Sequence, residues 1–164
     1  MGAGKTTVSK LIHDQTKNVA LLGKDRIKWS LSGFVRSKPQ NATANAVTLA
    51  MVKAYLAHGA SIMMDQSFVN PTATEPYIRA AKSARVPVVT IRLDAPLTTL
   101  LARLATRPKP TSAKTAVTKT RIMRNIRGYY AKPVPKGVVT VQTDGRTPEE
   151  IASDVLKQLR SLLK

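Results

Sequence analysis

Four short segments of the chain are apolar at nearly every position, which is typical of parallel strands covered on both faces. These predicted strands cover residues 19–24, 61–65, 87–94 and 137–143. Between them, apolar positions recur every three or four residues, as on the buried face of a helix. The predicted helices cover residues 4–17, 42–58, 73–85, 96–106, 113–130 and 147–163. This alternation predicts a three-layer α/β fold, with a parallel sheet between helices and right-handed crossovers.

Proline and acidic residues mark the starts of two of these helices. Pro148 is followed by two glutamates, which the helix dipole favours in a first turn, and Pro96 precedes another helix. Asp94 is expected to cap the helix that follows it, and Asp144 to stabilise a turn. The segment 107–115 is rich in proline and poor in apolar residues, which indicates an exposed connection.

Composition limits the class of protein. A chain of 164 residues with 43% apolar content predicts one domain, residues 1–164, with an ordinary core. We expect no membrane association and a cytoplasmic location, because no apolar run approaches the roughly 20 residues of a membrane span and no signal peptide is evident. The absence of cysteine excludes disulfides and thiolate metal sites.

The charge is strongly positive, with 27 Lys and Arg against nine Asp and Glu. Such a surface attracts polyanions in a salt-dependent way. A phosphate-handling enzyme, a nucleic-acid binder and a protein from an organism with a basic proteome would all show this excess. Residues 95–143 contain ten basic residues and no acidic one.

The chain begins with "MGAGKTTVSKL", which matches the closing half of the phosphate-binding motif G-x-x-x-x-G-K-[ST]. Gly4, Lys5 and Thr6 fit the final G-K-T, and the motif's first glycine would precede Met1 by two residues. Lys5 is expected to contact the ATP phosphates, and the Thr6 hydroxyl to bind Mg²⁺. The ATP-binding residues at this loop are Gly2, Ala3, Gly4, Lys5, Thr6 and Thr7. The alternative is a flexible, glycine-containing terminus.

Two aspartates follow predicted strands, at the sheet edge where α/β proteins bind ligands. Asp25 is the candidate general base, which would take the proton of an attacking hydroxyl. Its alternative role is to cap a helix that starts near Arg26. Asp65 is expected to hold Mg²⁺ together with Thr6, or to orient the acceptor. Trp29, near the expected acceptor site, is a weaker candidate for ring stacking.

The segments "GAGKTT", "KDRIKW", "IMMDQS" and "LLARLATR" together resemble the AAA-type P-loop kinases of the adenylate kinase-like group. The resemblance extends over nearly the whole chain and includes polynucleotide 5′-kinase domains, zeta toxins and chloramphenicol phosphotransferase. It implies a P-loop NTPase fold of strand order 2-3-1-4-5, here without its central first strand. Because loss of a central strand leaves backbone groups unpaired, we expect the gene to extend upstream or the product to be truncated.

The resemblance also implies site residues. Residues 103–130 correspond to the family's LID, in which Arg107 would contact the phosphates and Arg103 the base or the phosphates. The family places an arginine three residues after the base, where this chain has Lys28, with Arg26 adjacent to Asp25. Both are expected to bind the acceptor, and the change to lysine leaves the acceptor's identity open.

These observations predict an ATP-dependent kinase in which Lys5, Asp25 and Arg107 act in transfer to a hydroxyl acceptor. The acceptor would be a small molecule or a polynucleotide 5′-OH, with ATP and Mg²⁺ as cofactors. Two alternatives are a noncatalytic nucleic-acid-binding protein on a decayed P-loop fold and a P-loop ATP hydrolase. The basic surface would add nonspecific nucleic-acid binding through Arg121, Arg124 and Arg127.

Overall fold

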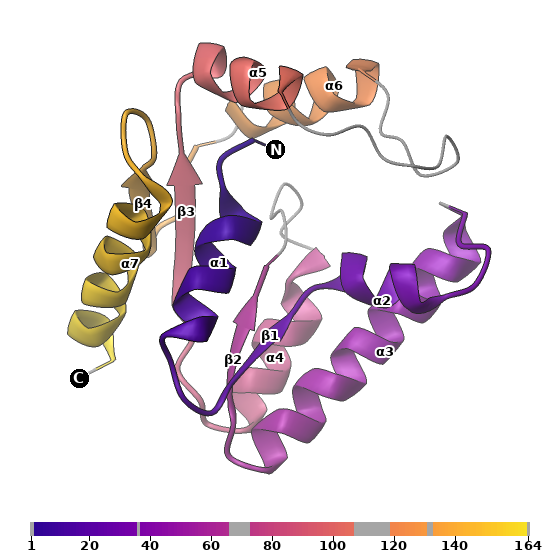
Figure 1. Cartoon of the computed structure of the whole chain (residues 1–164). Coiled ribbons are helices and arrows are strands. Elements are labelled where there is room, and N and C mark those ends of the chain that lie inside the picture. The colour runs from indigo at the N-terminus through magenta and orange to yellow at the C-terminus, as the bar shows by residue number, and fades with distance from the viewer. Residues whose placement is uncertain (1, 36, 66–72, 107–118, 131–132, 164) are drawn as a thin grey trace. The chain divides into compact units, whose positions relative to one another are not determined.

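The computed structural model describes residues 2–35, 37–65, 73–106, 119–130 and 133–163 (Figure 1). The strands are β1 (Val19–Leu22), β2 (Ser61–Met64), β3 (Thr90–Asp94) and β4 (Val138–Gln142). The helices are α1 (Lys5–Asp14), α2 (Lys24–Ser30), α3 (Lys38–Ala57), α4 (Glu75–Ser83), α5 (Leu97–Ala105), α6 (Lys119–Tyr130) and α7 (Pro148–Leu162). The order of elements confirms the predicted α/β pattern.

The strands form two parallel pairs. β1 pairs with β2, with Val19 opposite Ser61 and Leu22 opposite Met64. β3 pairs with β4, with Thr90 opposite Val138. In the expected family order 2-3-1-4-5, strands 2, 3, 4 and 5 correspond to β1, β2, β3 and β4 of this chain. Without strand 1, that order leaves the pairs β1–β2 and β3–β4, so the described pairing agrees with the expected topology.

Contacts between residues divide the chain into two compact units. One unit contains α1, β3, α5, α6, β4 and α7 and is called the loop unit, because it includes the glycine-containing loop. The other contains β1, α2, α3, β2 and α4 and is called the acceptor unit. Each unit is described by itself below.

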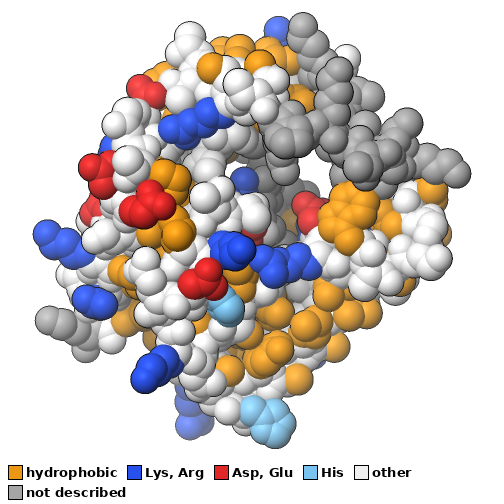
Figure 2. Space-filling model, viewed as in Figure 1, with side chains coloured by type: hydrophobic (Ala, Val, Ile, Leu, Met, Phe, Trp, Pro, Cys, Tyr) orange, Lys and Arg blue, Asp and Glu red, His pale blue; other side chains and the backbone are white. Residues whose placement is uncertain are grey.

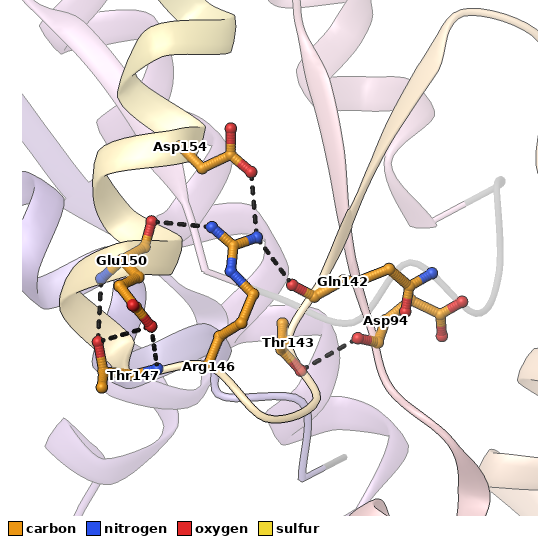
Figure 3. Close-up of polar contacts among 7 residues, drawn as sticks. All are labelled: Asp94, Gln142, Thr143, Arg146, Thr147, Glu150 and Asp154. Atoms are coloured by element: carbon orange, nitrogen blue, oxygen red, sulfur yellow. Dashed lines mark hydrogen bonds and ion pairs between the residues drawn. The ribbon is translucent and has the colours of Figure 1, made fainter.

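In the loop unit, α1 packs against α7, and α7 packs against β4 (Figure 1). The start of α7 confirms the predicted signals, since Pro148 is its first residue and a capping box joins Thr147 and Glu150. The Thr147 hydrogen bonds lower the pKa of the Glu150 carboxyl. Arg146 links the end of β4 to α7, donating to the Gln142 carbonyl and to the Asp154 carboxylate at 3.1 Å (Figure 3).

In the acceptor unit, α3 covers β1 and β2, and both α2 and α4 pack against α3. Leu22, Val52 and Tyr77 form the buried centre of this unit. Burial raises the pKa of the Tyr77 phenol, while its hydrogen bond to Thr48 acts in the opposite direction. Apolar burial of this kind is the main term that holds a small α/β unit together.

Three boundaries differ from the prediction for identifiable reasons. α3 begins at Lys38 rather than at residue 42, because the Ser37 hydroxyl accepts the Gln40 N–H and caps the helix. β3 begins at Thr90, later than the predicted residue 87, which is a proline and has no N–H to donate to a ladder. α2 was absent from the periodic pattern, since seven residues give too few turns for a clear period.

Candidate phosphate-transfer site

The glycine-containing loop has a backbone conformation that is energetically unfavourable for residues with a Cβ atom. Gly2 and Gly4 have φ values of 82° and 81°, in the left-handed region. Gly4 is the N-cap of α1, and no side chain caps this helix. No side chain therefore caps the first-turn N–H groups of α1. Phosphate-binding loops use uncapped N–H groups at the start of a helix in the same way.

The loop is also packed, which favours an ordered loop over the alternative of a flexible terminus. Ala3 is buried in a cluster with Ala95 and Leu100. A Cβ atom on Gly2 would lie 2.9 Å from the Leu100 carbonyl oxygen and 3.4 Å from Leu104 Cγ. The absence of a side chain at Gly2 thus permits the loop to lie directly against α5.

Lys5 and Thr6 open the helix that follows this loop. The Lys5 side chain is partly exposed, and the side chains of Thr6 and Thr7 are exposed. A ligand at the loop would reach all three without displacing core residues. Their predicted contacts with ATP and Mg²⁺ stay predictions.

The acceptor unit brings the other candidates to one sheet edge. β1 and β2 end side by side, and the Asp65 N–H donates to the Leu22 carbonyl at 2.8 Å. α2 begins one residue after Gly23, where a Cβ atom would lie 2.9 Å from the Asp65 carbonyl oxygen. Gly23 therefore allows α2 to start beside Asp65, and no local sequence pattern predicts this close approach. Asp25 and Asp65 both follow the carboxyl end of this strand pair.

Asp25 lies in the first turn of α2 and does not cap it, because Gly23 is the N-cap. Lys28 Nζ donates to Asp25 Oδ1 at 3.0 Å, and the Lys28 ammonium lies 6.0 Å from the Phe34 ring centroid. The Lys28 side chain is 8% exposed and that of Asp25 is 74% exposed. Lys28 thus reaches from the interior to orient a carboxylate that faces solvent.

Lys24 adds a second cation to this group and was not among the site residues predicted from the sequence. Burial lowers the pKa of the Lys24 ammonium, the neighbouring Lys28 lowers it further, and Asp25 opposes both effects. Arg26 is exposed beside Asp25. The edge of the acceptor unit therefore carries one exposed carboxylate among three cations.

In the loop unit, Arg103 contacts the end of β4. Its Nη1 donates to Thr143 Oγ1 at 3.0 Å, and its Nη2 donates to the Thr143 carbonyl at 2.7 Å. Thr143 in turn donates to the Asp94 carbonyl at 3.0 Å (Figure 3). The predicted nucleotide contact of Arg103 stays a prediction. Arg107 lies outside the described residues, as does much of the expected LID.

Asp94 has a different role from the one predicted. The N-cap of α5 is Pro96, and no side chain caps this helix, so the prediction of an Asp94 cap was wrong. Its Oδ1 instead accepts the Ala95 N–H at 3.1 Å and the Tyr129 hydroxyl at 3.2 Å. The cause is Pro96, because the residue before a proline is disfavoured in the helical conformation, so the helix does not begin at Ala95 and Asp94 stays in the strand.

Arg92 completes this cluster. Its Nη2 lies 3.7 Å from Asp94 Oδ2, and its guanidinium stacks 3.9 Å from the centroid of the Tyr129 ring. Burial, followed by the charge of Asp94, raises the pKa of Tyr129 to about 12. The sequence offered no periodic or motif signal for this cluster, because Tyr129 lies 35 residues after Asp94 along the chain.

Among the residues that the structure describes, no group of three or more His, Cys, Asp or Glu could hold a metal ion. None of the helices in the same part of the chain has both the length and the apolar character that a membrane span requires.

Comparisons with known proteins place the chain in a family. A search of curated proteins finds no match. Among solved structures, a sugar kinase from Janibacter sp. HTCC2649 is similar, with TM-score 0.66, 15% identity and coverage of 97% of this chain and 89% of the other. The tunicamycin resistance protein of Deinococcus radiodurans has TM-score 0.62, 16% identity and coverages of 96% and 90%. The APS kinase of Mycobacterium tuberculosis, solved with AMPPNP and APS, has TM-score 0.62, 16% identity and coverages of 97% and 92%.

At these identities the structural matches show the fold, which is that of P-loop kinases. A family model described as an AAA domain matches residues 1–132, which is most of the chain. The glycine-containing loop and the end of β1 both lie within the matched range. The chain therefore belongs to the AAA domain family and has the α/β P-loop NTPase fold.

Proposed function

We propose that this protein is an ATP-dependent kinase that transfers the γ-phosphate of ATP to a hydroxyl group. The observation that carries the proposal is the ordered loop of Gly2 and Gly4, which opens directly into α1 with Lys5 as its first residue. The placement of an exposed Asp25 at the carboxyl end of β1 supplies the second requirement, a base for the acceptor.

The loop would hold ATP by its phosphates. Backbone N–H groups from Gly2 to Thr7 are suited to phosphate oxygens, and the Lys5 ammonium would neutralise charge on the β and γ phosphates. Thr6 and Asp65 are the residues that would hold Mg²⁺, which supplies charge neutralisation on the phosphates when bound. Arg103 and Arg107 are proposed to complete the ATP site from the LID.

Transfer needs an activated hydroxyl. The acceptor oxygen attacks the γ-phosphorus, its proton passes to the Asp25 carboxylate, and the bond to the β–γ bridging oxygen breaks as ADP leaves. Lys28 would hold the Asp25 carboxylate in one orientation through the 3.0 Å ion pair. Arg26 and Lys28 would also contact the acceptor. The neighbours named a sugar kinase and an APS kinase support a nucleotide-binding phosphotransferase in general.

Phosphoryl transfer tests the proposal directly. The protein is incubated with Mg²⁺ and ATP labelled at the γ-phosphate, with a panel of alcohols, and labelled product is separated from free phosphate. We expect Asp25→Asn to lower turnover by about 10² or more, the contribution of a general base, while ATP affinity changes only a few-fold. Asp14→Asn, which alters an exposed carboxylate at the end of α1, is the matched control. Release of free phosphate alone, unaffected by any alcohol, would indicate an ATP hydrolase instead.

Nucleic-acid binding is the second candidate, favoured by the exposed side chains of Arg124 and Arg127 on α6. The triple exchange of Arg121, Arg124 and Arg127 to Gln separates the two functions. If these arginines contact duplex phosphates, the slope of log affinity against log salt should fall by about two to three. Steep, salt-dependent nucleic-acid binding that vanishes in the triple variant, with no ATP turnover, would replace the kinase proposal.

A further inference from the structure

Trp29 is a large apolar side chain that the core does not use. It is 56% exposed, the highest value among the exposed large hydrophobic residues that the structure describes. Its ring meets the buried Phe34 ring edge to face, with centroids 6.3 Å apart and an interplanar angle of 65°. This contact holds the indole in one orientation, while more than half of its surface stays open to solvent.

The position of Trp29 relative to the candidate base is set by the helix. Asp25 and Trp29 are four residues apart on α2, so they lie on the same face, about one turn of 5.4 Å from each other. Both side chains are exposed there. Figure 2 shows a hydrophobic surface over α2 directly beside an acidic side chain.

The surroundings of the indole indicate a ring-binding surface. Arg26 is exposed and lies three residues before Trp29 on the same helix, so a ligand at this edge meets an aromatic face, a carboxylate and a cation together. Stacking of a planar ring on an aromatic side chain contributes about 1 to 3 kcal/mol and needs no particular hydrogen-bond pattern. A linear polyol has no planar ring face with which to cover the indole.

We propose that the acceptor of this kinase is an alcohol with a planar aromatic or heteroaromatic ring, which stacks on Trp29 while its hydroxyl faces Asp25. The inference rests on the proposed function, because it assigns the substrate class of the same site. It selects ring-bearing alcohols, such as nucleosides with a free 5′-hydroxyl or aryl alcohols, over aliphatic polyols. The distance of one helical turn requires a short link between the ring and the reacting hydroxyl.

Trp29 is the only tryptophan of the chain, so its fluorescence reports this contact directly. The protein, without ATP, is titrated with adenosine, with a thymidine dinucleotide that has a free 5′-hydroxyl, with 2-phenylethanol and with ribitol. We expect at least one ring-bearing probe to quench the emission and to protect it from acrylamide, while ribitol does neither. The dinucleotide and 2-phenylethanol distinguish nucleoside chemistry from simple aryl chemistry. Equal responses to ribitol and to every ring-bearing probe, or no response to any, would overturn the inference.

A pair of variants separates stacking from bulk apolarity. Calorimetry should show that Trp29→Leu binds the quenching probe about five- to 100-fold more weakly, the loss of one stacking contact, and that Trp29→Phe recovers part of it. Tyr55→Leu, at an exposed aromatic residue of α3, should have no effect. Unchanged affinity in Trp29→Leu would refute the ring site.

The binding measurements do not depend on catalysis, so the two proposals fail separately. Ring binding that requires Trp29, with no phosphoryl transfer to any probe, would refute the kinase proposal and leave the ring site in place. Transfer to ribitol as efficient as transfer to the ring-bearing alcohols, and equal in Trp29→Leu, would refute the ring site and leave the kinase.

Discussion

The phosphate loop and the acceptor edge are built by different means. In the loop, the backbone of Gly2 and Gly4 adopts left-handed conformations and lies against α5, so the decisive feature is the absence of side chains. At the acceptor edge, a buried Lys28 and an exposed Asp25 pair across one turn of α2, so the decisive feature is charge placed on side chains. The loop therefore depends on the shape of its backbone, and the acceptor edge depends on the orientation of the Asp25 carboxylate.

This difference predicts different responses to substitution. A change at Gly2 or Ala3 should alter folding and ATP binding together, because these two residues of the loop pack against the interior. A change at the acceptor edge should alter turnover with little effect on stability, because Asp25 is exposed and its ion pair adds little net free energy.

The largest effect is expected for Gly2→Ala. The left-handed conformation costs a residue with a Cβ about 1 to 2 kcal/mol, and the 2.9 Å approach to the Leu100 carbonyl adds about 1 to 3 kcal/mol of overpacking. Gly137→Ala is the matched control, because its φ is 83° and no atom lies within 4 Å of the added Cβ. Denaturant titration of both variants measures the difference, and equal losses of stability would show that the loop is not packed as described.

Lys5→Ala should weaken ATP binding while the fold is retained. A hydrogen bond to a charged group contributes about 1.5 to 3 kcal/mol, so the dissociation constant should rise about tenfold to 100-fold. Lys10→Ala, an exposed lysine on the same helix, is the control. Calorimetry with ATP and Mg²⁺ measures both variants, and wild-type affinity in Lys5→Ala would remove the loop from the ATP site.

Lys28→Met tests whether the charge of Lys28 orients the Asp25 carboxylate. The unbranched side chain fits the buried position, and we expect stability to change by about 1 kcal/mol or less, as for other ion pairs with an exposed partner. Turnover should fall about tenfold to 100-fold, since small displacements of a catalytic group are costly. Thermal unfolding and phosphoryl-transfer assays on the same preparation measure stability and turnover. A large loss of stability with normal turnover per folded molecule would show that Lys28 stabilises the fold and does not orient Asp25.

The smallest effect concerns the Arg92–Asp94–Tyr129 cluster of the loop unit. Because the pKa of Tyr129 is about 12 when folded and about 10 when unfolded, the folded state retains its proton between these values. The contribution is fully present below pH 10 and is lost as the pH rises toward 12. We expect Tyr129→Phe to reduce this alkaline loss of stability. Matching pH profiles for the wild type and Tyr129→Phe would contradict the assignment.

The fold could be predicted because its signals are local. Continuous apolar runs marked the four strands, and Pro148 with the two glutamates after it marked the start of α7 within one residue. The loop motif identified Gly4 and Lys5 because its spacing is short and specific. These features depend on residues that are neighbours in the sequence.

The features that were missed depend on residues that are distant in the sequence. Arg92, Asp94 and Tyr129 meet only after β3 and α6 are placed, and Gly23 is needed only because Asp65 lies beside it. Asp94 was expected to cap a helix because "DAP" is locally compatible with a cap, and Pro96 took that position instead. Local patterns therefore found the elements, while contacts between elements decided the roles of side chains.

Thr143 shows which residue types a contact between elements permits at one position in related sequences. Its buried hydroxyl accepts from Arg103 and donates to the Asp94 carbonyl, so it joins the ends of β3 and β4 to α5. Valine has the same shape and would leave the Arg103 and Asp94 groups without this partner, whereas serine would keep both bonds and lose only a methyl group. An alignment of relatives should therefore retain a hydroxyl at this position, and that conservation would record folding rather than catalysis.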